Sequence, residues 1–232
     1  MKIYLSCYKC DDRRKYPSTV LDNGIYQLVC DSGHKVSICV QQTKFEQFYE
    51  ISLNALIDGC YRDAVVSVNA AIERLYEFYI KFVMEKNNSF DVFGDAWKRV
   101  SSQSERQLGA YVFLYSLENN RLPPLLSTSM VTFRNNIVHK GEFPTLDKTI
   151  EFCKSATDVI IPVLKEMKSE WDVYRVVFNR DMSEKYEGQP LSDNVQLVSS
   201  VSYLALIEHG SNFDNVRDSV ADMRTIYSKQ LW

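Results

Sequence analysis

The chain has 232 residues and a net charge of −3, and 45% of its residues are hydrophobic. Glycines and prolines are few and aromatic residues reach 12%, which excludes a disordered chain and indicates one large domain or two small ones. The near-balanced charge excludes a strongly basic nucleic-acid-binding protein, so contact with RNA needs a local patch. No apolar run approaches the roughly 20 residues of a membrane span, and residues 1–7 contain no signal-peptide apolar region. We therefore expect a cytoplasmic protein without a membrane partner.

Two pairs of metal-ligand residues lie near the start of the chain. Cys7 and Cys10 have Cys-x2-Cys spacing, Cys30 and His34 have Cys-x3-His spacing, and 19 residues separate the pairs. Short spacing lets one turn present two ligands, and the long loop can bring both pairs around a tetrahedral Zn²⁺. Cys39 is an alternative to His34 as the fourth ligand. A closed set of four ligands leaves no position for a substrate, so we expect structural rather than catalytic zinc.

The residues around these pairs favour short strands. Strand-like runs cover residues 2–6, 25–29 and 35–40, and residues 22–24 form a turn signal between the first and second of them. Segment 1–43 therefore resembles a zinc ribbon. So small a segment can hardly bury a core unaided, and metal binding would supply its folding energy.

Residues 44–180 are predicted to form a helical bundle. Apolar residues recur at spacings of three and four, most clearly over residues 61–86. Residues 181–232 are predicted to be a mostly helical C-terminal extension, with β-branched residues in its first part that also admit a strand. The other predicted helices cover residues 44–58, 89–99, 105–117, a helix opened by Pro123 and Pro124, a long run over 146–178 that Pro162 kinks or shortens, 195–207 and 213–227.

The sequence from Phe133 to Gly141 is a short cassette of polar side chains on a predicted helix. Leu126, Met130, Phe133 and Ile137 form one apolar stripe, and Gly141 fits just past the helix end. Lys140 and a protonated His139 would complement the negative end of the helix. Beside this buried anchor the cassette offers a guanidinium, an amide and an imidazole, those of Arg134, Asn135 and His139.

The spacing Arg134-x4-His139, with Asn135 beside the arginine and Lys140-Gly141 after the histidine, resembles the signature of HEPN domains. These are small helical domains, many of which are metal-independent endoribonucleases that work as dimers. The resemblance implies a mainly α protein, with an antiparallel HEPN-like bundle after a small N-terminal β zinc ribbon. It also implies an acidic residue near the arginine and histidine, and Glu73, or alternatively Glu77, fits that place on the helix over residues 61–86.

The cassette contains groups suited to RNA cleavage without a metal ion, in which the 2′-hydroxyl attacks its own phosphate. His139 can act as general base or acid, Arg134 can stabilise the phosphate, and Asn135 can orient the imidazole. On a regular helix Arg134 and His139 differ by about 140° and about 7.5 Å of rise. One copy does not easily aim both at one phosphorus, so the nuclease interpretation implies a homodimer with a composite site.

Three hypotheses follow for the function. The first is a HEPN-type endoribonuclease acting on an RNA substrate as a toxin or anti-phage defence effector, with an antitoxin or regulatory protein as a further partner. The second is a non-catalytic HEPN-like scaffold that binds RNA, nucleotide or a protein partner. The third is a nucleic-acid-binding zinc ribbon whose helical part only dimerises.

Overall fold

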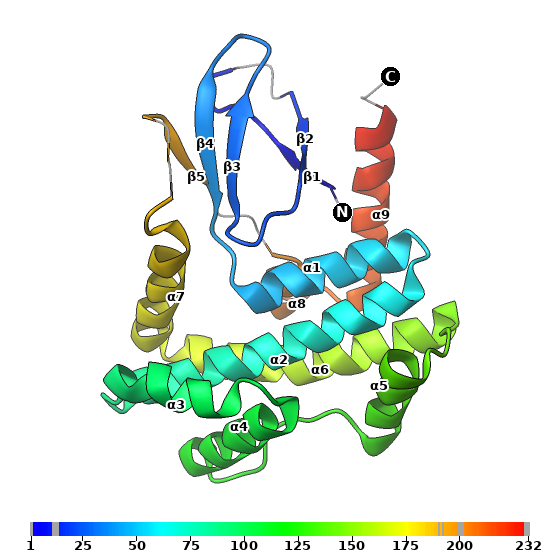
Figure 1. The fold of residues 1–232 in the computed structure, drawn as a ribbon. Helices are drawn as coiled ribbons and strands as arrows, with labels where there is room; N and C mark the ends of the chain where they lie inside the picture. Colours follow the sequence, from blue (N-terminus) through cyan, green and yellow to red (C-terminus); the bar gives the residue numbers. More distant parts are fainter. Residues whose placement is uncertain (1, 11–13, 190, 192, 199–201, 230–232) are drawn as a thin grey trace. The chain divides into compact units, whose positions relative to one another are not determined.

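The computed structural model describes residues 2–10, 14–189, 191, 193–198 and 202–229. It is mainly helical, with a small amount of β structure that lies mostly near the N-terminus (Figure 1). This confirms the predicted fold class at that level, while the HEPN-like bundle stays a prediction. None of the helices within the described residues is long and apolar enough to cross a membrane.

The chain divides into two compact units, residues 1–43 with 178–201 and residues 44–177 with 202–232. We call them the β unit and the helical unit. The C-terminal stretch 181–232, which the sequence sets apart as an extension, is divided between the two. Its first part belongs to the β unit, and the part from Ser202 onward belongs to the helical unit.

The β unit contains two small sheets. Strands β1 and β2 pair antiparallel, β3 and β4 form an antiparallel hairpin, and β5 joins β4 in parallel. Buried side chains from these strands surround two of the cysteines, Cys7 and Cys30, in a small apolar core. The strands are β1 (Lys2–Leu5), β2 (Tyr16–Thr19), β3 (Ile25–Val29), β4 (Lys35–Val40) and β5 (Val195–Val198).

Two strands differ from the prediction. β2 was not predicted, because it is only four residues long and contains Pro17, which removes a hydrogen-bond donor. β5 was predicted chiefly as helix, but its residues pair with β4 instead. Asn194 accepts a hydrogen bond from the Ser37 N–H at 2.8 Å, and Val198 accepts one from the Gln41 N–H at 2.9 Å. The β-branched residues admitted this strand, but the partner that selects it over a helix lies more than 150 positions away.

The helical unit is organised around α2, which packs against α1, α4, α5 and α6. Its apolar face buries a continuous row of side chains, including Val68, Ile72 and Leu75. The helices are α1 (Lys44–Ile57), α2 (Tyr61–Lys86), the 3₁₀ turn η1 (Phe90–Val92), α3 (Phe93–Val100), α4 (Ser104–Asn119), α5 (Thr128–Lys140), α6 (Leu146–Ser169), α7 (Trp171–Tyr186), α8 (Tyr203–Glu208) and α9 (Phe213–Lys229).

Helices α8 and α9 are held on the helical unit by buried apolar residues and by ion pairs to α6. Leu204 on α8 is fully buried. Lys168 of α6 lies 2.6 Å from Glu208 of α8, and Lys154 of α6 lies 2.7 Å from Asp214 of α9. The last part of the chain therefore completes the fold of the unit that contains α5.

Two predicted helix boundaries are wrong. Helix α5 begins at Thr128 rather than at the prolines, because Ser127 is its N-cap and accepts a hydrogen bond from the Met130 N–H. The run over residues 146–178 is two helices rather than one. It breaks at Glu170, whereas Pro162 lies inside α6 without ending it.

Candidate functional site

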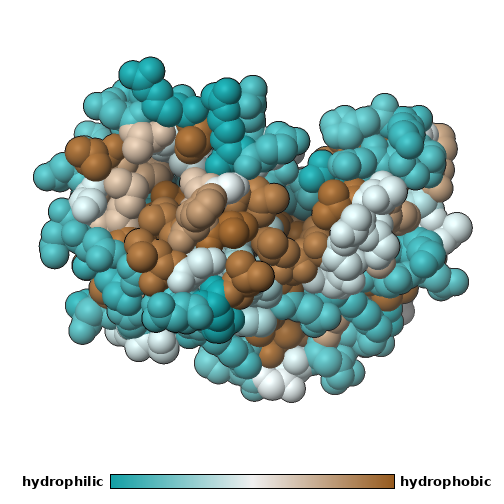
Figure 2. Space-filling model, turned by 90° about the horizontal axis from the view of Figure 1, so that it is seen from below, coloured by the Kyte–Doolittle hydropathy of each residue, from teal (hydrophilic) through white to brown (hydrophobic). Residues whose placement is uncertain are grey.

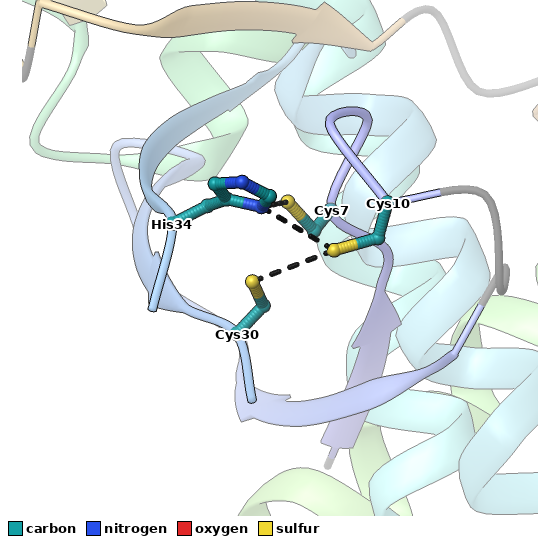
Figure 3. A group of neighbouring side chains, drawn as sticks. All are labelled: Cys7, Cys10, Cys30 and His34. Atoms are coloured by element: carbon teal, nitrogen blue, oxygen red, sulfur yellow. Dashed lines mark hydrogen bonds between the residues drawn. The ribbon is translucent and has the colours of Figure 1, made fainter. Parts of the chain in front are cut away.

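Three cysteines and a histidine form a compact cluster in the β unit (Figure 3). Their ligand atoms all lie within 4.8 Å of one another. The Cys10 sulfur is 3.5 Å from that of Cys30 and 3.4 Å from His34 Nδ1, and the Cys7 sulfur is 3.8 Å from the same nitrogen. Around a tetrahedral ion with bonds of about 2.0–2.3 Å, neighbouring ligand atoms stand roughly this far apart. The cluster can therefore hold one metal ion.

Backbone hydrogen bonds in two tight turns present these ligands. The Cys10 N–H donates to the Cys7 carbonyl at 3.2 Å, which closes the first turn. In the second turn the Gly33 N–H donates to Cys30 O at 2.8 Å, and the Cys30 N–H donates to His34 O at 3.1 Å. Gly33 has φ of 78°, a left-handed conformation that glycine adopts without a Cβ penalty. The spacing of each predicted pair thus matches a turn that aims both ligands at one point.

Cys39, the alternative fourth ligand, is not part of the cluster, as judged over the described residues. It lies on β4 opposite Ile25 of β3, and it is 1% exposed. Burial raises the pKa of its thiol, which keeps it protonated. Its buried side chain packs within the β unit, and His34 is the fourth member of the cluster.

The thiols of the cluster share their protons unequally. Burial raises the pKa of Cys30, but hydrogen bonds from the backbone of His34 and from the Cys10 thiol outweigh this and lower it to about 7. A hydrogen bond with Ser32 lowers the pKa of Cys10, while the bond with Cys30 and burial raise it to about 11. Thiol ligands bind a metal ion as thiolates, so binding of an ion by this cluster would release protons.

A second candidate site lies at helix α5 in the helical unit. Ile137 is 1% exposed and anchors this helix, and the Phe133 ring packs on that of Phe152 with centroids 5.7 Å apart. Gly141, with φ of 74°, ends the helix as predicted. The anchor leaves Arg134 and Asn135 half-buried and His139 exposed near the helix end.

All four residues that the sequence nominated for catalysis line one cavity of about 270 Å³. Arg134, Asn135 and His139 approach it from α5, and Glu73 approaches it from α2. Glu77, the alternative acidic residue, does not line it and pairs with Arg74 instead. The other lining residues are Asn69, Ile72, Tyr76, Ser104, Glu105, Leu108, Leu125, Leu126 and Val131.

The Arg134 guanidinium, which lines the cavity, has an unpaired hydrogen-bond donor. Its Nε is buried without a hydrogen-bond partner in the described part of the chain. A buried donor left unpaired costs about 1–3 kcal/mol, so an acceptor that reached this nitrogen would gain a hydrogen bond. Burial raises the pKa of Tyr76, the Glu73 carboxylate raises it further, and the Arg134 guanidinium lowers it. Opposite charges therefore flank the Tyr76 hydroxyl.

Contacts between α2 and α4 fix the wall of the cavity that faces α5. The Tyr76 and Tyr111 rings stack with centroids 4.2 Å apart and planes 21° apart. Arg74 Nη2 donates to Gln107 Oε1 at 3.1 Å. These contacts hold Leu108 and Glu105, one face of α4, beside the residues of α2 that line the cavity.

The sequence reasoning missed the contribution of α2 beyond Glu73. Asn69, Glu73 and Tyr76 stand at positions i, i+4 and i+7, so they share one face of the helix. Asn69 Nδ2 donates to Glu73 Oε1 at 3.0 Å. This shared helix face is the signal in the sequence that places Asn69 and Tyr76 beside Glu73, but the amide and the hydroxyl carry no charge to mark them as site residues.

Comparisons with models of known protein families, with curated proteins and with solved structures find no match to this chain.

Proposed function

We propose that this protein is an endoribonuclease whose active site is the cavity bordered by α2, α4 and α5. One observation carries the proposal: the guanidinium, amide, imidazole and carboxylate of the nominated residues all line a single cavity. The resemblance of the Arg134-to-His139 spacing to HEPN domains points the same way. An imidazole can also supply the proton transfer, and a guanidinium the positive charge, for phosphodiester cleavage without a metal ion.

In this mechanism a ribose 2′-hydroxyl of the RNA attacks the adjacent phosphorus. His139 transfers one of the two protons of this step, as the base for the attacking hydroxyl or the acid for the departing 5′-oxygen, and solvent water or the His139 of a second copy transfers the other. Arg134 binds the phosphate oxygens as negative charge grows on them. Asn135, one turn before His139, orients the imidazole. The products are a 2′,3′-cyclic phosphate and a 5′-hydroxyl.

The test compares the cleavage of single-stranded RNA by the wild type, His139→Ala and Arg134→Ala. Each variant should lose about 10²–10³-fold or more in rate, and the wild-type product should carry a 2′,3′-cyclic phosphate. His209→Ala is the matched control because this histidine follows α8 and does not line the cavity. A wild type that cleaves no RNA, or an active His139→Ala, would overturn the proposal.

We further propose that the cysteine–histidine cluster holds structural Zn²⁺. Three thiolates and one imidazole are a zinc ligand set, and four protein ligands leave no position for substrate. Two of the cysteines belong to the small apolar core of the β unit. The bound ion would therefore add stability that so small a core cannot supply.

An apolar face of α4 supports association with a second protein surface. Phe113 is 80% exposed, Leu117 is 73% exposed, and Leu122 just beyond the helix is 75% exposed. Figure 2 shows hydrophobic residues gathered on the face viewed from below, the side on which α4 lies in Figure 1. We propose that two copies pair through this face. The same observation favours the second candidate function, a scaffold that binds a partner protein without catalysis.

A further inference from the structure

We propose that the cavity binds a guanine base, with Glu73 as the residue that selects it. This inference rests on the proposed function only for its setting in RNA, since a free guanine nucleotide contains the same base. Three features carry it: the acceptor atoms of Glu73, the apolar walls around them, and the Arg134 guanidinium that lines the same cavity.

Glu73 presents an acceptor edge inside the cavity. Among the described residues, the hydrogen bond that its side chain accepts comes from Asn69 and reaches Oε1, which leaves Oε2 for a ligand. Oε1 also retains a lone pair, because a carboxylate oxygen accepts more than one hydrogen bond. The bond from Asn69 fixes the rotamer of the carboxylate, so this edge is already oriented before a ligand arrives.

Guanine is the base whose pairing edge matches a carboxylate. Its N1–H and N2–H are adjacent donors that can meet the two oxygens of Glu73, and its O6 is an acceptor for the second N–H of Asn69 or for the Tyr76 hydroxyl. Adenine and cytosine place an acceptor nitrogen against the carboxylate, and uracil offers one donor between two acceptors. A base that leaves a carboxylate oxygen unpaired in a half-buried cavity binds more weakly.

The other residues that line the cavity include apolar side chains, which can pack against a planar base, and a cation, which can bind the adjacent phosphate. Apolar side chains of Ile72, Leu108 and Leu126 line the cavity beside these polar groups. Its volume of about 270 Å³ is below the roughly 300–1,000 Å³ of sites that enclose drug-sized ligands, so one nucleotide is the appropriate size. Arg134, with its unpaired buried Nε, lies on α5 and supplies a cation for the phosphate that follows the base.

The test is calorimetric titration of the full-length protein with the four ribonucleoside 3′-monophosphates. The wild type should bind the guanine nucleotide about 5- to 150-fold more tightly than the adenine nucleotide, the range expected from one good bidentate contact. Glu73→Gln replaces one acceptor by a donor, which matches adenine better than guanine. This variant should lose the guanine preference and gain affinity for the adenine nucleotide.

Glu77→Gln is the matched control. It makes the same chemical change one turn further along α2, at a carboxylate that pairs with Arg74 and does not line the cavity. The base preference of this variant should equal that of the wild type. Equal binding of all four nucleotides by the wild type, or an unchanged preference in Glu73→Gln, would overturn the inference.

Cleavage assays separate this inference from the proposed function. Guanine-selective binding without RNA cleavage would support the guanine site and contradict the nuclease activity. If instead the protein binds all four bases equally and cleaves next to each of them in a reaction that depends on His139, the nuclease activity would be supported and the guanine site contradicted. If both hold, cleavage should occur next to guanosine, and Glu73→Gln should shift it toward adenosine.

Discussion

Ile137 connects the stability of helix α5 to the geometry of the cavity. It is the buried residue of this helix, while Arg134, Asn135 and His139 surround it on less buried positions. The polar side chains therefore depend on Ile137, together with the Phe133 ring packed on Phe152, to keep α5 in place. A cavity that binds a phosphate needs its groups held within fractions of an ångström, so this anchor bears on activity as well as on folding.

We expect Ile137→Ala to lower the free energy of unfolding by about 2–5 kcal/mol, the usual cost of emptying a fully buried aliphatic site. Denaturant titration followed by circular dichroism measures it. Val138→Ala is the control, because Val138 is only half-buried and its truncation should cost clearly less. Equal costs for the two variants would show that Ile137 is not the anchor.

The sequence alone predicts the site residues of the cassette, but only one of the α2 residues that line the cavity. Arg134, Asn135 and His139 stand close together in sequence, so their chemistry can be noticed without a structure. Asn69 and Tyr76 carry no charge and sit on a helix more than 50 residues earlier, where their spacing resembles that of any amphipathic helix. What links them to the cassette is the packing of α2 against α5, which no local pattern contains.

The two turns that present the cysteine–histidine cluster are the elements that the proposed zinc ion would stabilise most. Each turn is only a few residues long, and together they place the Cys10 sulfur beside that of Cys30 and beside His34 Nδ1, contacts that without an ion offer weak hydrogen bonds alone. Metal binding supplies on the order of 10 kcal/mol to small domains of this type. The β unit should therefore fold with its ion, whereas the helical unit has an apolar core that needs none.

Cys10→Ser should abolish stoichiometric zinc binding and loosen the β unit. Metal content measured by atomic emission should fall from one ion per chain to much less. Hydrogen exchange should speed up in β3 and β4 but stay slow in α2. Cys60→Ser is the control, because Cys60 is exposed and lies outside the cluster. A Cys10→Ser protein that retains a full complement of zinc would contradict this ligand assignment.

Whole elements are predictable where one strong periodic signal covers them. The helix predicted over residues 61–86 is confirmed at both ends, since its apolar face continues unbroken over seven turns. The break at Glu170 has no comparable local signal. Lys86 of α2 binds Glu170 at 2.9 Å, so a tertiary contact accompanies the change of chain direction there. The prolines before α5 misled for a different reason: Ser127, three residues after Pro124, caps the helix and defines its start.

At the scale of the whole molecule, α4 is the helix whose surroundings are incomplete. Its inner face stacks Tyr111 on Tyr76, and its outer face exposes Phe113 and Leu117. Residues 108–117 contain no charged side chain. A helix that is apolar on both faces belongs between two packing partners, and a second copy of the chain presents the same uncharged surface for an isologous contact.

We therefore expect the wild type to have twice the mass of its 26.9 kDa chain in light scattering or sedimentation. Phe113→Asp should weaken the dimer about 10- to 100-fold, because it places a carboxylate at the centre of an apolar contact. Val176→Asp is the control, since Val176 is an exposed residue on α7 rather than on α4. A monomeric wild type would contradict the pairing.

The same variant tests whether pairing completes the site. Arg134 and His139 line the same cavity of one copy, so RNA cleavage by monomeric Phe113→Asp would show that pairing is not needed. Loss of cleavage together with the dimer would instead indicate that the partner contributes to it.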